Sequence, residues 1–396
     1  MKTKLRWSSL GLGLALAGVL ALVELPAADS SQSSSPPRER GTARVEETRP
    51  KSFPHRIWAA CDFEAQTPDY AWFGAAEFKQ IPTYPGNVTA LAAKPKSGGK
   101  ISALKNGMNP VPGPVMGKVN KLYLRYFLKG TTEATFQHYS LSSNDNNHIR
   151  VSGLTEGKWS EVTLNFTRDG LRNDGTPGVP FKEGERMDDF QLYVGKLDDG
   201  KDYECVIDDV IFFADDPDLP PVAEPFPKRV IFLASFDTGI DPKSREKYWP
   251  GEFDIVTANK GAPEGAYWGV AKAVAQKDAK GKKLIRLQVA PARPVGAHTK
   301  LRFRYHLSGA SAMTVQMFDA TDQDNRHIDL KDLKQGAWNW ANLDFTKDAK
   351  RNDGKDTPFA AGHKVDDIFF FVAPDEGKDV ELFVDEVVLY DAGAAP

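Results

Sequence analysis

Cysteine is scarce in this chain, which has two cysteines, Cys61 and Cys205, among 396 residues. The sequence also contains no zinc-ligand motif, no nucleophile elbow and no phosphate-binding loop. The motifs of the common metalloenzymes, hydrolases and nucleotide-binding enzymes are therefore missing. A polysaccharide-cleaving enzyme would need two carboxylates held across a cleft, which a sequence alone does not show.

Excess charge is missing too, since 51 Lys and Arg residues stand against 54 Asp and Glu residues, for a net charge of -3. No basic stripe predicts nucleic acid as a partner. The one long apolar run, Leu10–Val23, is short for a membrane span. It follows Lys2, Lys4 and Arg6, so residues 1–28 are predicted to be a signal peptide, with an uncleaved anchor as the alternative. We expect a protein that is secreted, periplasmic or on the cell surface.

One stretch of the chain occurs twice. Residues 122–175 and 301–354 align without a gap at an offset of 179, with 22 identities in 54 positions. An internal repeat of this kind predicts two copies of one domain. We place the first copy at residues 55–215 and the second at residues 229–392.

Two segments outside the copies have a different composition. Residues 29–54 are rich in Ser, Pro and charge, which predicts a disordered leader. Residues 216–228 contain five prolines, which predicts a stiff and extended linker. Two weak sites joined by such a linker would bind one polymer with raised avidity.

Apolar and polar residues alternate within each copy. Every second residue of Leu301–Leu307 is apolar, and Leu122–Leu128 repeats the pattern. This period of two predicts strands, and no convincing amphipathic helix appears. About eight strands per copy predict an all-β protein of two tandem jelly-roll β-sandwiches.

The two cysteines lie near the two ends of the first copy, and the second copy has Ala234 and Leu382 at these places. An exported protein permits a disulfide, which would form easily if the first and last strands are neighbours. Two small buried thiols are the alternative. The sequence leaves both open.

Short motifs recur at the start, middle and end of the copies. They are Phe63-Glu64, Gly157-Lys158-Trp159 and Ile207–Asp215 in the first copy, and Phe236-Asp237, Gly336-Ala337-Trp338 and Val384–Asp391 in the second. Together they resemble carbohydrate-binding modules of the galactose-binding-like β-sandwich type. The resemblance covers both copies and implies a jelly roll that binds a glycan. In such modules an early acid and a late acid often hold a structural calcium ion.

The matching acids here are Glu64 with Asp208 and Asp237 with Asp385. Asp208 and Asp385 share strand faces with apolar residues, so each needs a partner or a metal. Oxygen ligands suit Ca²⁺, which is the one cofactor that we expect. The alternative is a carboxylate that caps backbone amides at a strand bulge.

A second polar set recurs at the same offset. It consists of Gln137, Asp145, Asn146 and His148 in the first copy and Gln316, Asp324, Asn325 and His327 in the second. Planar donors and acceptors of this kind suit the hydroxyl groups of a sugar. The alternative is turn chemistry, in which Asp and Asn bond to their own backbone.

Two further pairs are candidates for ligand binding. Arg172 and Arg351 precede Asn-Asp-Gly turns and could pair with a loop acid or with an acidic sugar. Trp159 and Trp338 fall on the strand face opposite the apolar residues. They could stack on sugar rings, or a bulge could turn them into the core.

The leading hypothesis is a secreted, non-catalytic protein that binds a glycan or polysaccharide through two β-sandwich modules. One alternative is a polysaccharide lyase or glycosidase on a jelly roll, which would bring an acid or His together with an Arg in a pocket. The other is a structural protein of the cell surface with exposed apolar patches.

Overall fold

The structure is a computed structural model that describes residues 42–44, 49–64, 72–74, 76–84, 87–93, 104–107, 113–172, 181–194, 201, 203–237, 248–277, 279, 281–353, 355 and 357–393. Residues 39–396 form one compact unit. The helix α1 (Phe166–Asp169) is short. No helix in these ranges has the length and apolar character to cross a membrane. The predicted signal peptide lies outside the described residues.

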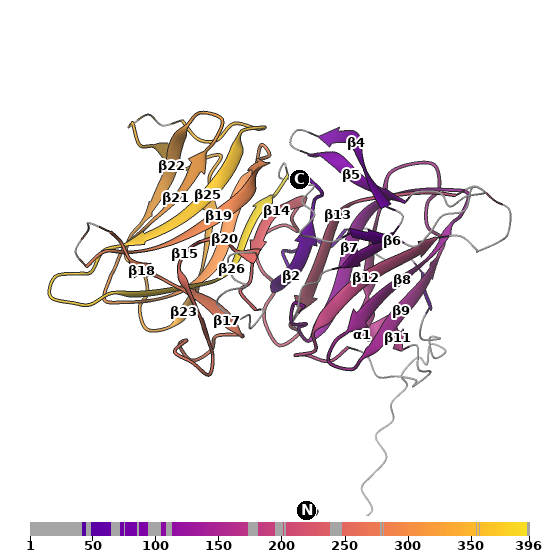
Figure 1. The fold of residues 1–396 in the computed structure, drawn as a ribbon, viewed down its shortest axis with the longest axis horizontal. Helices are drawn as coiled ribbons and strands as arrows, with labels where there is room; N and C mark the ends of the chain where they lie inside the picture. The colour runs from indigo at the N-terminus through magenta and orange to yellow at the C-terminus, as the bar shows by residue number, and fades with distance from the viewer. Residues whose placement is uncertain are drawn as a thin grey trace, which may run out of the picture. The chain divides into compact units, whose positions relative to one another are not determined.

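The first repeat is a sandwich of two sheets (Figure 1). One sheet, called here its junction sheet, has the strand order β10 (Ser160–Asn165), β7 (Val119–Lys129), β13 (Glu204–Asp215), β5 (Asn87–Ala93), β4 (Ala76–Tyr84), and β2 (Arg56–Cys61) also pairs with β13. The other, its distal sheet, has the order β1 (Thr42–Arg44), β9 (Asp145–Ser152), β8 (Glu133–Ser140), β12 (Met187–Val194), β6 (Leu104–Gly107), β3 (Trp72–Gly74), with β11 (Leu171–Arg172) on β9.

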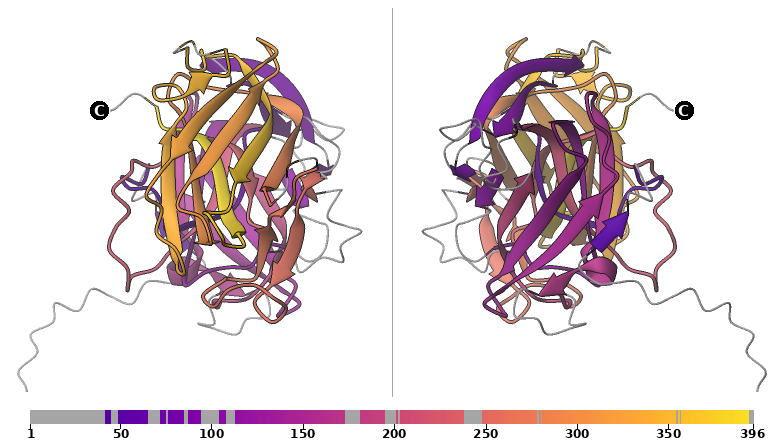
Figure 2. Two further views of the ribbon diagram at one scale, coloured as in Figure 1. Left: turned by 90° about the vertical axis from the view of Figure 1, so that its left-hand side faces the viewer. Right: turned by 90° about the vertical axis from the view of Figure 1, so that its right-hand side faces the viewer.

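The second repeat has the same two layers. Its junction sheet has the order β16 (Asp254–Thr257), β17 (Gly269–Lys272), β26 (Glu381–Asp391), β20 (Thr299–Ser308), β23 (Trp338–Asp344), and β14 (Arg229–Ala234) pairs with β26. Its distal sheet has the order β15 (Gly251–Glu252), β19 (Lys283–Pro294), β25 (Lys364–Val372), β21 (Met313–Asp319), β22 (Asp324–Leu330), β24 (Lys350–Arg351), with β18 (Val274–Ala275) on β19. Figure 2 shows the strands of this distal sheet side by side in its left view.

The predicted all-β class and the two β-sandwiches are confirmed. All pairings between these strands are antiparallel except that of β1 with β9. Alternation places Leu301, Phe303, Tyr305 and Leu307 of β20 in the apolar core of the second repeat. A separate apolar core lies between the two sheets of the first repeat. Each repeat therefore buries its own core, as the internal repeat predicts.

The first and last strands of the first repeat are neighbours, but the two cysteines are free thiols. Cys61 at the end of β2 lies opposite Val210 of β13, whereas Cys205 lies five residues earlier in β13 and opposite Leu128. A strand rises about 3.3 Å per residue, so this separation exceeds the reach of a disulfide. The structure therefore has two free thiols, of which Cys205 is buried and Cys61 is partly buried.

Part of the leader is ordered, which differs from the expected disorder. β1 extends the distal sheet of the first repeat, in parallel with β9. Arg49 pairs with Glu161 at 3.0 Å, and its guanidinium lies over the ring of Tyr123. These residues are ordered because they have partners on the first repeat. Composition alone does not reveal such contacts.

The Pro-rich linker also packs on the first repeat. The ring of Phe226 meets Tyr123 and Phe213 edge-on, with centroid distances of 5.0 and 5.3 Å. The backbone N–H of Phe53 donates to the carbonyl of Glu224. The linker therefore does not span a gap between separate modules.

One core residue of the first repeat makes stability depend on pH. His138 of β8 is buried against the rings of Phe166 and Phe212, and burial lowers its pKa from 6.5 to about 3. Between these pH values the unfolded chain binds a proton that the folded chain rejects, so stability falls as the pH falls. The slope approaches about 1.4 kcal/mol per pH unit inside this window.

The second repeat has Met317 at the equivalent buried position. We therefore expect His138→Met to remove this loss of stability between pH 6.5 and 3, as measured by urea unfolding of both proteins over that range. Met313→Leu in the second repeat is the matched control and should leave the pH dependence unchanged. An equal slope for wild type and His138→Met would contradict the prediction.

Candidate functional site

A row of side chains crosses the outward face of the distal sheet in the second repeat. Strand pairing sets six residues opposite one another on successive strands, namely Glu252, Arg286, Phe369, Gln316, His327 and Lys350. Directly paired residues lie on one face of a sheet, so all six face away from the core. At the usual strand spacing the row is about 24 Å long.

Aromatic rings line the centre of this face. Phe369 and Phe371 flank the core residue Phe370, and their two rings stack 5.4 Å apart at 9°. Arg286 lies over the ring of Phe369 and donates to both oxygens of Asp367, at 2.9 and 3.0 Å. The rings are thus partly exposed and held in place. Sequence reasoning missed them because three successive Phe residues look like core.

Amide groups extend the row, and one bond recurs in both repeats. Gln316 Nε2 donates to Asn325 Oδ1 at 2.9 Å, and Gln137 Nε2 donates to Asn146 Oδ1 at 3.0 Å. An amide side chain has two N–H donors and one carbonyl acceptor, so amides suit the hydroxyl groups of a sugar. The predicted Gln, Asn and His residues therefore come together on one face in each repeat.

The distal sheet of the first repeat has the equivalent row. Gln191, Gln137 and His148 lie opposite one another on β12, β8 and β9. Gln137 Nε2 donates to Gln191 Oε1 at 3.2 Å, and the hydroxyl of Tyr193 also donates to that oxygen. Tyr193 is 40% exposed. Gln191 and Tyr193 were not found from the sequence, although they alternate with the core residues of β12.

The acids next to these Asn residues have a local role. Asp145 Oδ1 accepts the backbone N–H of Asn146 at 2.7 Å, and Asp324 Oδ1 accepts that of Asn325 at 2.8 Å. Each Asp thus fixes the start of its strand, β9 or β22. This geometry favours the turn chemistry that was the alternative for these two acids.

The two candidate arginines pair with acids of the protein. Arg351 lies 2.8 Å from Asp324 and 3.3 Å from Asp322. Arg172 lies 3.1 Å from Glu185, which also accepts from Ser140 Oγ at 2.7 Å. Both arginines therefore end in ion pairs with protein carboxylates. The rest of the turn after Arg172, residues 173–175, lies outside the described residues.

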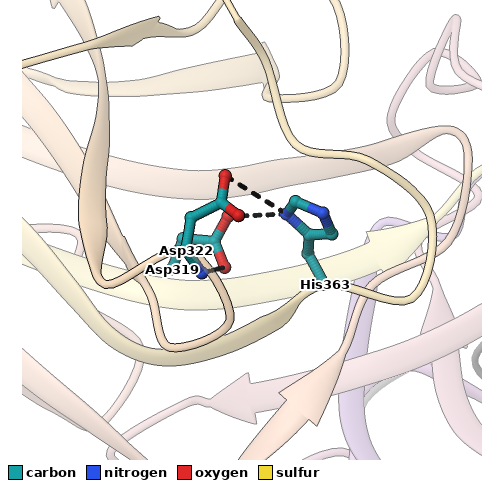
Figure 3. A group of neighbouring side chains, drawn as sticks. All are labelled: Asp319, Asp322 and His363. Carbon is teal, nitrogen blue, oxygen red and sulfur yellow. Dashed lines mark hydrogen bonds and ion pairs between the residues drawn. The ribbon is translucent and has the colours of Figure 1, made fainter. Parts of the chain in front are cut away.

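Asp319, Asp322 and His363 form a cluster whose ligand atoms could meet at one metal ion. His363 Nδ1 points to both carboxylates, at 2.7 Å from Asp319 and 3.9 Å from Asp322 (Figure 3). However, Arg326 Nη2 already lies 2.7 Å from Asp322 and 3.4 Å from Asp319. A guanidinium beside both carboxylates offsets their charge, so the arrangement fits an ion-pair network better than a cation site.

The candidate tryptophans belong to the other layer. Trp338 and Trp340 lie on β23 of the junction sheet and face away from the core, as alternation predicts. Arg304 lies 4.5 Å over Trp338, just as Arg125 lies 5.3 Å over Trp159 in the first repeat. The indole rings and the Gln, Asn and His residues are thus on opposite sheets, and they do not form one site.

The acids predicted to bind calcium sit beside arginines. Asp385 Oδ2 is 3.5 Å from Arg304, and Asp237 pairs with Arg56. Asp385 Oδ1 accepts the backbone N–H of Glu386 at 2.8 Å. This last bond is the capping of an amide at a bulge that was the alternative to a metal.

The first repeat repeats this arrangement with Arg125. Asp208 Oδ2 is 3.6 Å from Arg125, and Asp208 Oδ1 accepts the N–H of Asp209 at 2.9 Å. Glu64 Oε1 accepts the N–H of Thr89 at 2.6 Å. The arginines therefore offset part of the charge that a cation would otherwise balance.

Some carboxylate oxygens in these sets remain fit for a cation. Asp208 Oδ2, Asp237 Oδ1 and Asp385 Oδ2 are buried and accept no hydrogen bond within the described structure. Oxygens of this kind are what Ca²⁺ prefers. Calcium at Glu64 with Asp208 and at Asp237 with Asp385 therefore stays a prediction.

Known proteins that are similar to this chain were found among solved structures. No protein-family model matches the sequence. No curated protein matches it either. A family 11 carbohydrate-binding module of the cellulosomal cellulase Lic26A-Cel5E of Clostridium thermocellum is similar over 41% of this chain and 95% of its own, with 12% identity and a TM-score of 0.28.

Two other solved structures are similar to a comparable degree. The CBM22-1 xylan-binding domain of Xyn10C from Paenibacillus barcinonensis matches 42% of this chain and 96% of its own, at 13% identity and a TM-score of 0.25. SGBP-B from a complex xyloglucan utilization locus in Bacteroides uniformis matches 80% of this chain and 98% of its own, at 10% identity and a TM-score of 0.25. The function proposed below rests on the side chains of this chain.

The substitution Asp385→Asn distinguishes two roles of Asp385, that of a calcium ligand and that of a buried acid without a metal. Burial raises the pKa of Asp385 well above its usual value of 3.8, Glu386 raises this pKa further, and Arg304 opposes the shift. The carboxyl group is neutral in both states below pH 3.8, and its contribution to stability is lost as the pH rises through the folded pKa. Without metal, Asp385→Asn should therefore melt above wild type at pH 7 and close to it below pH 4.

A calcium site reverses the sign of this effect. Calorimetry at pH 7 would compare the melting temperatures in millimolar calcium and in excess chelator. With a calcium site, the chelator should lower the melting temperature of the wild type and leave that of Asp385→Asn unchanged. Melting that is unmoved by the chelator, together with a more stable variant, would contradict the calcium prediction. Asp344→Asn, outside this set of acids, is the control substitution.

Proposed function

We propose that this protein binds a polysaccharide or other glycan, without cleaving it, through the outward faces of its two distal sheets. The observation that carries the proposal is the row Phe369, Gln316, His327 and its counterpart Gln191, Gln137, His148. Rings present apolar faces to the C–H groups of a sugar, and planar amides and imidazoles meet its hydroxyls. A row across several strands suits an extended chain of sugars better than a compact small molecule.

The carboxylate beside the aromatic rings supports binding without catalysis. Asp367 lies beside the row, and Arg286 holds both of its oxygens. A carboxylate in a bidentate pair is poorly suited to act as a general acid or as a nucleophile. Secretion is part of the proposal and rests on the signal-peptide pattern in residues 1–28.

The test is binding of the purified chain to mixed-linkage β-glucan, xylan, xyloglucan, β-1,4-galactan and dextran, with each polysaccharide also assayed for new reducing ends and unsaturated products. We expect binding to at least one polysaccharide and no cleavage of any. Released product would support the enzyme hypothesis instead. Absence of binding to the whole panel, with and without calcium, would contradict the proposal and favour a structural surface protein.

Substitutions locate the site. Phe369→Ala should weaken binding at the second repeat roughly tenfold, because loss of a stacked ring costs about 0.5–1.5 kcal/mol beyond its buried area. Gln316→Ala should also weaken it, by leaving the bound hydroxyl with one partner fewer. Isothermal titration with an oligosaccharide of the bound polysaccharide measures both effects.

Trp340→Ala is the matched control for these substitutions. Trp340 is 40% exposed, but it lies on the junction sheet. Its removal should leave the affinity unchanged. Loss of binding in Trp340→Ala with full binding in Phe369→Ala would move the site to the other sheet and contradict the proposal.

A further inference from the structure

The two repeats pack together through their junction sheets. Tyr123 and Phe213, on the outward face of the first repeat, share one buried cluster with Val388 and Tyr390 of the second. Phe226 of the linker belongs to the same cluster. The other repeat thus covers part of the face of each junction sheet that points away from its own core.

Buried ion pairs cross this junction in both directions. Arg56 of the first repeat pairs with Asp237 and, at 2.7 Å, with Glu386 of the second. Arg229 of the second repeat lies 3.6 Å from Asp62 of the first and is fully buried. Separation of the repeats would take the partner away from each of these buried charges. Because a buried charge without a partner is costly, the ion pairs resist separation of the two repeats.

The exchange is reciprocal but not strictly two-fold, because Glu64 and not Asp62 matches Asp237 in the recurring motifs. Arg56 is the first residue of β2, and Arg229 is the first residue of the equivalent strand β14. Each arginine reaches an acid that follows the other strand, Asp237 after β14 and Asp62 after β2. Each repeat therefore gives one arginine to, and takes one arginine from, the other. The repeats are therefore held in one relative orientation.

This packing decides where the two candidate faces point. The core of each repeat lies between its junction sheet and its distal sheet. Because the junction sheets meet, each distal sheet lies on the far side of its own core. The row with Gln137 and the row with Gln316 therefore face away from one another.

We propose that the protein bridges two glycan chains, one held by each distal sheet, and so cross-links polysaccharide. This proposal rests on the proposed function. It differs from the sequence-based expectation that two sites on a stiff linker bind one polymer with raised avidity. A polymer segment that lies flat on one face cannot reach the other, since two cores stand between them. Two faces that point apart bind two chains, or two distant segments, at once.

The experiment uses two colours of beads, both coated with the polysaccharide that binds most tightly in the panel above. The full chain should join red and green beads into mixed clusters, and clustering should pass through a maximum as the protein concentration rises and each face becomes saturated separately. Titration with a short oligosaccharide of the same polysaccharide should give two sites per chain.

Two variants disable one face each. Gln137→Ala with Gln191→Ala acts on the first repeat, and Gln316→Ala with Phe369→Ala acts on the second. All four residues lie on an outward face, so both variants should fold, which circular dichroism checks. Each variant should still bind beads at its intact face, while mixed clusters fall at least tenfold. Trp340→Ala should cluster beads as wild type does.

The outcomes separate this proposal from the one on which it rests. Binding of the full chain without mixed clusters would overturn cross-linking and leave glycan binding standing. Clustering by both single-face variants would also overturn it, because bridging would then come from association between protein molecules. Failure to bind any polysaccharide would remove both proposals.

Discussion

Burial of arginine side chains beneath the junction of the two sandwiches is the constraint on which the rest of the structure depends. Arg229 is fully buried, and Arg302 and Arg304 are 7% and 5% exposed. A guanidinium out of water needs carboxylates, carbonyls or aromatic faces around it. Arg304 has all three, since it contacts Asp385, the carbonyl of Gly265 and the ring of Trp338. Because Arg229 finds its carboxylate in the other repeat, the sandwiches cannot be treated as independent modules.

The sequence predicts the strands well because alternation is a local property. Leu301, Phe303 and Tyr305 point into the core as their spacing indicates. The same pattern predicts that Arg302 and Arg304 face water, and they are instead buried. Rings of the neighbouring strand β23 cover part of them, and the rest of the cover comes from far away in the chain, from Phe53 for Arg302 and from Tyr267 for Arg304. A pattern of period two reports which face a residue lies on, and it does not report what packs on that face.

The candidate site shows the same division. Gln316 and His327 could be paired from the sequence, because hairpin strands β21 and β22 are close in the chain and the set recurs at one offset. Phe369 completes the row from β25, a strand about forty residues further on whose position beside β21 is a matter of sheet order. Trp338 is a candidate because it falls on the strand face opposite the apolar residues, but β23 belongs to the other sheet. Membership of a sheet was the missing information in both cases.

One local arrangement connects features that the sequence presents separately. Asp209 and Glu386 have positive φ angles of 48° and 49°, which form bulges in β13 and β26. A bulge breaks the alternation, so two successive acids can approach one side of a strand. In the second repeat, Arg304 then lies between an acid and the ring of Trp338. In the first repeat, Arg125 lies 3.0 Å from Asp209 and 5.3 Å over Trp159.

The recurrence of acid, arginine and tryptophan thus has a structural reason that needs no ligand. The indole covers the guanidinium, and the guanidinium offsets the carboxylates that the bulge turns inward. Residues that combine in this way stabilise the junction sheet. The distal sheet of the second repeat has a comparable set in Asp367, Arg286 and Phe369. Gln137 and Gln316 are outside such sets, and their side chains bond to Asn146 and Asn325 on the outward face. Polar groups that are placed in the same way in both repeats, on the face opposite the junction, are the ones on which the proposed glycan binding rests.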